Sequence, residues 1–289
     1  HIGRLRGPLA ASYREFHALR TANNGVLHRR HRARYEELQR ELEFEVIRTV
    51  AVVCCTCATA GGERLRGLRF AHVIIDEATQ SVEPQTLIPC VKGAEFLVLV
   101  GDQCQLGPVV ESRAAATAGL QVSMFERLVL GGHPVFPLLQ QYRMHPLISA
   151  FPNITSYGGR LTDGVSASAR AGVGLPGKNG VVTWWHIASP EMAVRDSYAN
   201  EGEADAVVQV VTYLVTHGVE YDDIGVITPY DAQRAALLTR LHARAPDMDV
   251  DSVDAFQGQE REYIIISTVR SNITRAVGFV ADVRRQNVA

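Results

Sequence analysis

The stretch that decides the fold is FAHVIIDEATQ, residues 70–80, an apolar run that ends at two adjacent carboxylates, Asp76 and Glu77. The apolar residues follow one another without alternating with polar ones, which predicts a strand buried on both faces of a parallel sheet. Ligands of open α/β sheets bind at the carboxyl ends of such strands. At that end Asp76 can hold Mg²⁺ and Glu77 can accept a proton from an attacking water. Taken alone, the pair could also cap a following helix.

A second stretch, FLVLVGDQCQLGP at residues 96–108, has the same design. An apolar strand is followed by Gly101, which permits close approach of the backbone, and then by Asp102 and Gln105. A Gln beyond the strand next to a Mg²⁺ site can contact the γ-phosphate of a nucleotide. By itself the stretch also fits an ordinary passage from strand to turn.

Further along the chain, apolar runs of strand length alternate with helical patterns. Leu38, Leu42 and Val46 follow at four-residue spacing in the second of two charged helices, which the turn TANNG joins. The expected helices are 12–20, 30–48, 202–216 and 231–243, and the expected strands are 50–55, 70–75, 96–100, 135–139, 181–187, 224–228, 249–253 and 263–268. This pattern predicts an α/β fold with parallel sheets flanked by helices. We expect three parts: a helical segment 1–49, a first domain 50–133 and a second domain 134–289.

Composition limits the function less than the motifs do. The 289 residues, 46% of them hydrophobic, suffice for two domains with cores of their own. The net charge of −2 means that a nucleic-acid partner must be met by local basic patches. The apolar runs are too short for a membrane helix, and no secretion leader opens the chain. The start at His1 suggests a fragment of a longer protein.

Five cysteines, three of them within CCTC at 54–57, raise the question of disulfides or zinc. An odd count argues against a disulfide framework and fits a reducing compartment. The spacing needed for a zinc site is absent nearby. We therefore expect these thiols to pack as small apolar groups in a buried strand, 50–55.

Two stretches of the second half carry groups suited to phosphates. LLQQYRMHP at 138–146 supplies Tyr142 and Arg143, and SVDAFQGQE at 252–260 supplies Glu260. A guanidinium that reaches a transferring phosphate contributes about 10³ to 10⁵ in rate. The alternative for Arg143 is a structural salt bridge, which the residues alone leave equally open.

Together, in this order, the motifs DEA-x-Q, GD-x-x-QLGP, QYRMHP, TPY-x-x-Q, VDAFQG-x-E and D-x-RR-x-NVA resemble the motor of superfamily-one RNA and DNA helicases. CCTCATAG, QLGP and ITPYDAQR bring the chain closest to the up-frameshift RNA helicases, the regulators of nonsense transcripts. The resemblance covers about Arg34 to Ala289. It implies two RecA-like domains of the P-loop NTPase type, preceded by a paired-helix insertion.

The resemblance also implies roles for single residues. Asp76 would coordinate Mg²⁺ through water, and Glu77 would activate the hydrolytic water. Gln105 would sense the γ-phosphate, and Arg143 would act as an arginine finger. Tyr142 would stack on the adenine, and Glu260 would contact the sugar. Nucleic-acid contacts would come from Thr56, Ala58, Thr228, Pro229, Ser252 and Asp254.

The function that the resemblance implies is an ATP-dependent 5′-3′ helicase or translocase of nonsense-mediated mRNA decay. Its cofactors would be ATP and Mg²⁺, and its partners single-stranded RNA or DNA and proteins of mRNA decay. We expect the motor to be a monomer that does not associate with a membrane. We expect it to act in the cytoplasm and to shuttle to the nucleus. Two alternatives remain: a catalytically inactive RNA clamp of the same fold, and a metal-dependent hydrolase that uses Asp76, Glu77 and Asp102.

Two features depart from the family pattern. No G-x-x-x-x-G-K-[ST] loop precedes Asp76, and the chain ends at NVA, where the family continues with a further arginine. AGVGLPGKNG at 171–180 approximates the loop, but Asn179 replaces the Ser or Thr, no buried strand precedes it and an expected strand follows it. Lys178 is therefore expected on the surface, and residues 1–289 alone are expected to hydrolyse almost no ATP.

Overall fold

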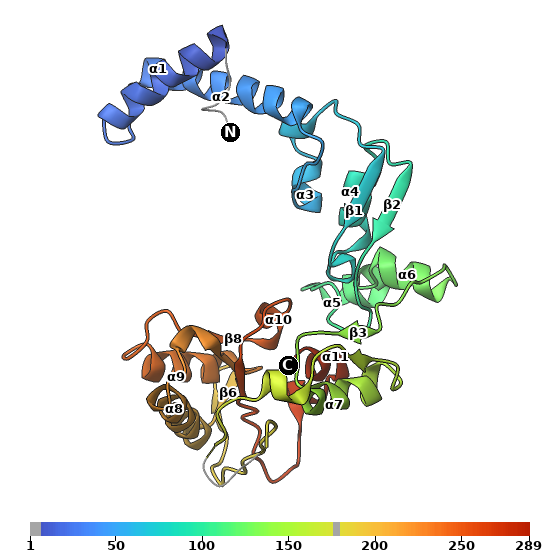
Figure 1. The fold of residues 1–289 in the computed structure, drawn as a ribbon, viewed down its shortest axis with the longest axis vertical. Helices are drawn as coiled ribbons and strands as arrows, with labels where there is room; N and C mark the ends of the chain where they lie inside the picture. The colour runs from blue at the N-terminus through green and yellow to red at the C-terminus, as the bar shows by residue number, and fades with distance from the viewer. Residues whose placement is uncertain (1–6, 176–179) are drawn as a thin grey trace. The chain divides into compact units, whose positions relative to one another are not determined.

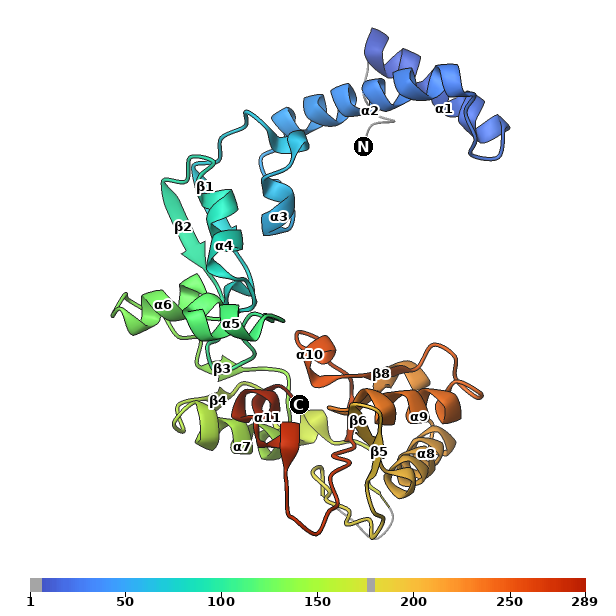
Figure 2. The same ribbon diagram turned by 180° about the vertical axis from the view of Figure 1, so that it is seen from behind.

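The computed structural model describes residues 7–175 and 180–289, and these residues form two compact units. The first unit contains the described residues up to Gly101 together with Val110–Phe125, and the second contains Asp102–Val109 and Glu126–Ala289. Each combines helices with parallel strands, which confirms the predicted α/β character (Figures 1 and 2). Gly177 and Lys178 of the loop-like stretch lie outside the described residues.

The first unit begins with a helical hairpin. Helices α1 (Pro8–Ala22) and α2 (Arg29–Thr49) lie side by side, as the sequence predicts (Figure 1). Leu38 and Leu42 are fully buried in the hairpin, and the ring of Tyr35 stacks on that of Tyr13 with 5.3 Å between centroids. Four-residue spacing places the two leucines on one face of α2, which gives this short hairpin its small core.

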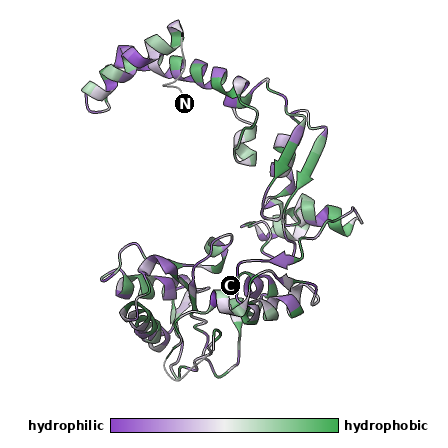
Figure 3. Ribbon diagram, in the orientation of Figure 1, coloured by the Kyte–Doolittle hydropathy of each residue, from purple (hydrophilic) through white to green (hydrophobic). Residues whose placement is uncertain are grey.

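The sheet of the first unit has two described strands. β1 (His72–Ile75) runs parallel to β2 (Phe96–Leu99), with His72 opposite Phe96. Val73 and Ile75 are buried, whereas Ile74 between them is 72% exposed. The prediction of a strand here is confirmed, but the prediction of burial on both faces is wrong, because the two strands are covered on one face only. Figure 3 shows that both strands are mainly hydrophobic.

The remaining elements of the first unit are short. They are α3 (Cys57–Ala60), η2 (Glu63–Leu65), η3 (Ala78–Gln80), α4 (Glu83–Cys90), α5 (Arg113–Ala115) and the π-helical turn η4 (Ala116–Leu120). Helix α6 (Met124–Leu130) contains Glu126, the residue at which the longer segment of the second unit begins.

Three predicted strands, 50–55, 135–139 and 181–187, are wrong. Within the described residues none of these segments pairs with a neighbouring strand, and a strand without a partner leaves its backbone groups and apolar side chains in water. Phe136 and Leu138 are each 89% exposed. Cys54 and Cys55 are exposed for the same reason, which corrects their expected burial.

The elements of the second unit surround a parallel sheet. Its helices are α7 (Pro146–Ser156), η5 (Ala167–Arg170), α8 (Glu201–Thr216), η6 (Tyr221–Asp223), α9 (Asp231–Leu241), α10 (Val253–Phe256), η7 (Gly278–Ala281) and α11 (Val283–Val288). Its strands are β3 (Gln140–Gln141), β4 (Thr162–Asp163), β5 (Met192–Val194), β6 (Ser197–Ala199), β7 (Ile224–Ile227), β8 (Asp249–Asp251) and β9 (Tyr263–Ile266). The predicted strands near 224, 249 and 263 and the helices near 202 and 231 are confirmed.

Strand β7 lies at the centre of this sheet, between β8 and β9, and is buried on both faces. On one face Ile224 and Val226 pack against apolar residues of α8 and α9, among them Leu237. On the other face Ile227 packs with Phe256. A continuous apolar strand is what these two cores require.

The compact units divide differently from the predicted boundary at residue 133. Segment 102–109 follows β2 in the chain, yet it belongs to the second unit, because Leu106 is buried there with Ile227, Val253 and Phe256. No helix of the described residues is both long enough and apolar enough to span a bilayer.

Leu237→Ala tests the core on the helical side of β7. Leu237 is fully buried, so its truncation is expected to lower the free energy of unfolding by about 2 to 5 kcal/mol. The measurement is urea denaturation followed by circular dichroism. Ile273→Ala, at a fully exposed position, is the control and is expected to change stability by less than about 0.5 kcal/mol. Equal losses in the two variants would contradict this assignment of the core.

Candidate nucleotide site

Asp76 and Glu77 lie exposed, directly after β1. Glu77 adopts a left-handed backbone conformation with φ of 49°, and its N–H donates to Asp76 Oδ1 at 3.0 Å. The turn is held by a hydrogen bond of 2.8 Å from the N–H of Ala78 to the carbonyl of Val100. Holding a residue other than glycine in this sparsely populated backbone conformation costs about 1 to 3 kcal/mol. Such strained residues occur most often at functional sites. The turn presents two carboxylates side by side.

The donor set at this turn fits a magnesium ion. Mg²⁺ in phosphate-transfer sites is held by one or two carboxylates together with phosphate oxygens and water. The exposed carboxylate of Asp76 at a strand end meets that requirement. The described residues contain no group of three or more His, Cys, Asp or Glu side chains arranged to hold a metal by themselves.

Gly101 explains how β2 passes this turn. A Cβ at Gly101 would lie 3.2 Å from the backbone nitrogen of Thr79 and 3.4 Å from that of Ala78. Backbone atoms give way less readily than the end of a side chain. The close approach expected from the sequence is thus present within the first unit.

Gln105 belongs to the second unit and is held at both ends of its amide. Its Nε2 donates to Asp102 Oδ2 at 3.1 Å, and its Oε1 accepts from Gln257 Nε2 at 3.4 Å. Asp102 Oδ1 accepts the N–H of Cys104 at 2.9 Å, which closes a tight turn. The amide of Gln105 therefore has a defined orientation.

Arg143 and Glu260 form an ion pair in the second unit although 117 positions separate them. Both side chains are largely exposed. Arg143 thus has a salt-bridge partner, which is the residue expected to contact the sugar, and its role toward a phosphate stays a prediction. Tyr142 is also exposed; its hydroxyl donates to Gln140 Oε1 at 2.9 Å, and its ring lies so close to Gly164 that a Cβ there would clash.

The loop that carries Tyr142 and Arg143 is fixed by Gln141 and Asp163. Gln141 Nε2 donates to Asp163 Oδ1 at 2.6 Å, and Gln141 Oε1 accepts the N–H of Met144 at 2.8 Å. The hydroxyl of Ser149 donates to the same Asp163 oxygen at 2.7 Å. The hydrogen bonds from Gln141 and then Ser149 hold the pKa of Asp163 below its ordinary value, because they favour the charged carboxylate.

The residues expected to contact nucleic acid lie in different environments. Thr56 and Ala58 are exposed, and Thr56 caps α3 by accepting the N–H of Thr59 at 3.2 Å. Thr228 is fully buried, and its hydroxyl has no partner within the described part of the chain, whereas Pro229 is half-buried.

The last two of these residues belong to the start of α10: Ser252 is its N-cap and Asp254 lies in its first turn. Ser252 caps α10 through the N–H of Ala255 at 3.2 Å. Asp254 accepts two hydrogen bonds from Arg285, at 3.1 and 3.2 Å. The roles of all these residues toward nucleic acid stay predictions.

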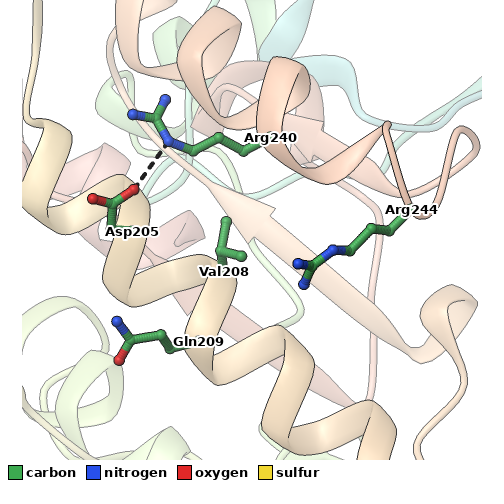
Figure 4. A pocket seen from close by; sticks show the side chains of 5 residues that line it. All are labelled: Asp205, Val208, Gln209, Arg240 and Arg244. Atoms are coloured by element: carbon green, nitrogen blue, oxygen red, sulfur yellow. Dashed lines mark hydrogen bonds and ion pairs between the residues drawn. The ribbon is translucent and has the colours of Figure 1, made fainter.

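A shallow pocket of about 410 Å³ lies between α8 and α9 (Figure 4). It is lined by Asp205, Val208, Gln209, Arg240 and Arg244. Arg240 Nε donates to Asp205 at 3.2 Å and also pairs with Glu201, so its charge is compensated. The lining includes none of the predicted site residues.

In the second unit the structure brings Arg143 to Glu260 and Gln105 to Gln257, and in the first it places Asp76 beside Glu77. Sequence reasoning missed Tyr157, whose hydroxyl donates to Asp102 Oδ2 at 2.6 Å, and Asn287, which donates to that hydroxyl at 2.8 Å. Asn287 occurs in the terminal motif NVA, but no sequence signal connects Tyr157 with residue 102.

Comparison of the sequence with known proteins identifies the family of this chain. Two family models, each described as an AAA domain, match residues 14–113 and 120–289. The chain belongs to the AAA domain family. This AAA-domain chain is 43% identical over 269 residues to Regulator of nonsense transcripts 1 of Caenorhabditis elegans, a match that covers 89% of the chain and 25% of the relative.

Two further relatives agree. The homolog of Regulator of nonsense transcripts 1 in Arabidopsis thaliana is 43% identical over 89% of the chain and 22% of its own length. The ATP-dependent helicase NAM7 of Saccharomyces cerevisiae is 42% identical over 88% of the chain and 28% of its own length. The resemblance to the up-frameshift helicases is confirmed. The AAA-domain chain spans about a quarter of the length of these curated relatives.

Asp163→Asn tests the support of the Tyr142–Arg143 loop. Because the pKa of Asp163 is lowered in the folded state, the folded protein binds fewer protons, and this stabilisation is complete above the ordinary carboxyl pKa of about 4. It is lost as pH falls through the lowered pKa. Urea denaturation from pH 7 to pH 3 is expected to show a smaller acid-induced loss of stability in the variant than in the wild type.

Asp222→Asn, a change at an exposed acid on η6, is the matched control and should keep the wild-type pH dependence. Parallel curves for Asp163→Asn and the wild type would contradict the role given to Asp163.

Proposed function

We propose that this chain is part of an ATP-dependent 5′-3′ helicase or translocase motor that acts on single-stranded RNA in nonsense-mediated mRNA decay. The observation that carries the proposal is a pair of contacts within one unit that link three distant segments carrying the helicase motifs: Gln105 with Gln257, and Arg143 with Glu260. The printed names of the relatives support the same reading.

In the proposed architecture the two units correspond to parts of two RecA-like domains. The parallel strands with acidic or polar residues at their carboxyl ends support this assignment. The hairpin of α1 and α2 corresponds to the paired-helix insertion of the family. Two of its arginines, Arg32 and Arg34, already form ion pairs with Glu36 and Glu37 on the same helix, so its charge toward nucleic acid is partly compensated.

The chemistry that we propose begins at the turn after β1. Bound to Asp76, Mg²⁺ would neutralise charge on the nucleotide phosphates. Glu77, held beside it, accepts the proton of the attacking water. Its exposed carboxylate and fixed backbone suit that task, because a general base must reach a water that approaches from solvent.

The second unit supplies the remaining groups. Arg143 leaves Glu260 and contacts the phosphates, since a phosphate competes well for a guanidinium that is exposed. Glu260 then contacts the sugar hydroxyls, Gln105 contacts the γ-phosphate and Tyr142 offers its exposed ring to the adenine.

Nucleic acid is proposed to bind chiefly through its backbone. Thr56, Ala58, Pro229 and Ser252, all exposed or half-buried, can reach it without rearrangement, whereas buried Thr228 can take part only after a local change. Backbone contacts suit a motor that moves over any sequence. We propose that DNA is bound similarly, that the motor is monomeric and that proteins of mRNA decay regulate it in the cytoplasm and, through shuttling, in the nucleus.

Glu77→Gln in the full-length protein that contains this chain tests the proposal. Loss of the general base is expected to lower RNA-stimulated ATP hydrolysis by about 10² to 10⁴. RNA binding, measured by fluorescence anisotropy, should stay within about twofold, because the substitution removes a proton acceptor and changes none of the residues proposed to contact nucleic acid. A phosphate-release assay with and without single-stranded RNA gives the rate.

Three results decide between the alternatives. A wild-type protein that binds RNA without hydrolysing ATP would favour the inactive clamp, and Mg²⁺-dependent nuclease activity without ATP would favour the hydrolase. Robust RNA-stimulated hydrolysis by residues 1–289 alone would contradict the expectation that a separate G-x-x-x-x-G-K-[ST] loop is required.

A further inference from the structure

Segment 102–109 takes its conformation from the second unit. Leu106 is buried beside Ile227, Val253 and Phe256, next to Gln105 in the chain. Because truncation of a buried leucine is strongly destabilising, Leu106 anchors the segment on the second unit. It does not by itself orient the side chain of Gln105.

The orientation comes from Asp102. Its Oδ2 accepts two hydrogen bonds, from Gln105 Nε2 at 3.1 Å and from the hydroxyl of Tyr157 at 2.6 Å, while its Oδ1 accepts the N–H of Cys104. The carboxylate is thus fixed by a backbone group on one oxygen and by the tyrosine on the other. A carboxylate held at both oxygens cannot rotate, and the amide that donates to it keeps its place.

Asn287 commits the tyrosine proton to Asp102. Its Nδ2 donates to the hydroxyl oxygen of Tyr157 at 2.8 Å and to the carbonyl of Cys104 at 3.0 Å. Because an amide nitrogen can only donate, the hydroxyl must use its lone pair toward Asn287 and its hydrogen toward Asp102. Burial, and then the bond to Asp102, raise the pKa of Tyr157 above its ordinary value, so the hydroxyl keeps this hydrogen at neutral pH.

We propose that Tyr157, oriented by Asn287, is a positioning residue that acts through Asp102 to aim the amide of Gln105 at the γ-phosphate. The proposal rests on the proposed function for the role of Gln105. All four residues of this hydrogen-bond network belong to the second unit. Tyr157 lies at the end of α7 and Asn287 near the end of α11, both far from residue 105 in sequence. The γ-phosphate contact is therefore part of the same unit as Arg143 and Glu260.

A double-mutant cycle in the full-length protein tests the proposal. Tyr157→Phe removes only the hydroxyl and is expected to lower kcat for RNA-stimulated ATP hydrolysis roughly fivefold, the scale of one hydrogen bond. The KM for ATP should change by less than about twofold, because the lost interaction acts on the reacting phosphate. In a Gln105→Ala background the same change should have almost no further effect on kcat.

Tyr213→Phe is the matched control, since the hydroxyl of Tyr213 donates to the carbonyl of Gly174 outside this network. It should leave kcat unchanged. Asn287→Ala is the second variant, and it should resemble Tyr157→Phe in kcat and in its lack of effect in the Gln105→Ala background.

A spectroscopic measurement on residues 1–289 follows the network without catalysis. The side-chain amide resonances of Gln105 in ¹⁵N-labelled protein should shift in Tyr157→Phe and stay in place in Tyr213→Phe. Unmoved resonances, or a loss of kcat that adds fully to that of Gln105→Ala, would overturn the positioning role.

The activity of the wild type separates the two proposals. A wild type without RNA-stimulated hydrolysis would overturn the proposed function and this role with it. An active wild type in which Tyr157→Phe behaves like Tyr213→Phe would overturn the positioning role alone.

Discussion

The second unit depends on the burial of one strand, β7, on both of its faces. Because Ile224 and Val226 face one core and Ile227 faces the other, a shift of the strand by one residue would move each set into the opposite core. Its neighbours are fixed in turn: the N–H of Thr228 donates to the carbonyl of Asp251, and the N–H of Ser267 donates to the carbonyl of Ile227. The segments that begin at these strand ends carry much of the candidate chemistry.

The first unit shows what happens where such burial is missing. β1 and β2, like β7, consist mainly of apolar residues, yet their described neighbours cover one face only, and Ile74, Phe96 and Val98 remain exposed. The candidate turn after β1 is nevertheless well defined. The N–H of Glu77 donates to Asp76 Oδ1, the N–H of Ala78 donates to the carbonyl of Val100, and Ala78 is buried with Val73 and Ile75. Local geometry at a strand end therefore depends less on the complete sheet than the core does.

The sequence alone predicted which polar groups follow the strands and in what order. This was possible because phosphate chemistry demands carboxylates, amides and guanidinium groups at restricted places. The sequence also predicted the helices α1, α2, α8 and α9 from their periodicity. The prediction of a strand at 50–55 failed. A continuous apolar run indicates that a segment can be buried as a strand, but it does not indicate which neighbouring strand would pair with it. The sequence could not assign Leu106 to the second unit or join Tyr157 to Asp102, since both contacts depend on packing between distant segments.

The ion pair of Arg143 and Glu260 has a consequence for the entropy of ligand binding. A free arginine side chain samples many rotamers, and ordering it costs up to about 2 kcal/mol. Here a carboxylate orders the guanidinium before any ligand arrives, while the exposure of the pair keeps their attraction weak, at about 0 to 1 kcal/mol. An arriving anion would then replace Glu260 as the partner of a side chain whose rotamer freedom is already reduced. Added salt would screen the ion pair and so weaken this ordering of Arg143 at concentrations that leave the fold intact.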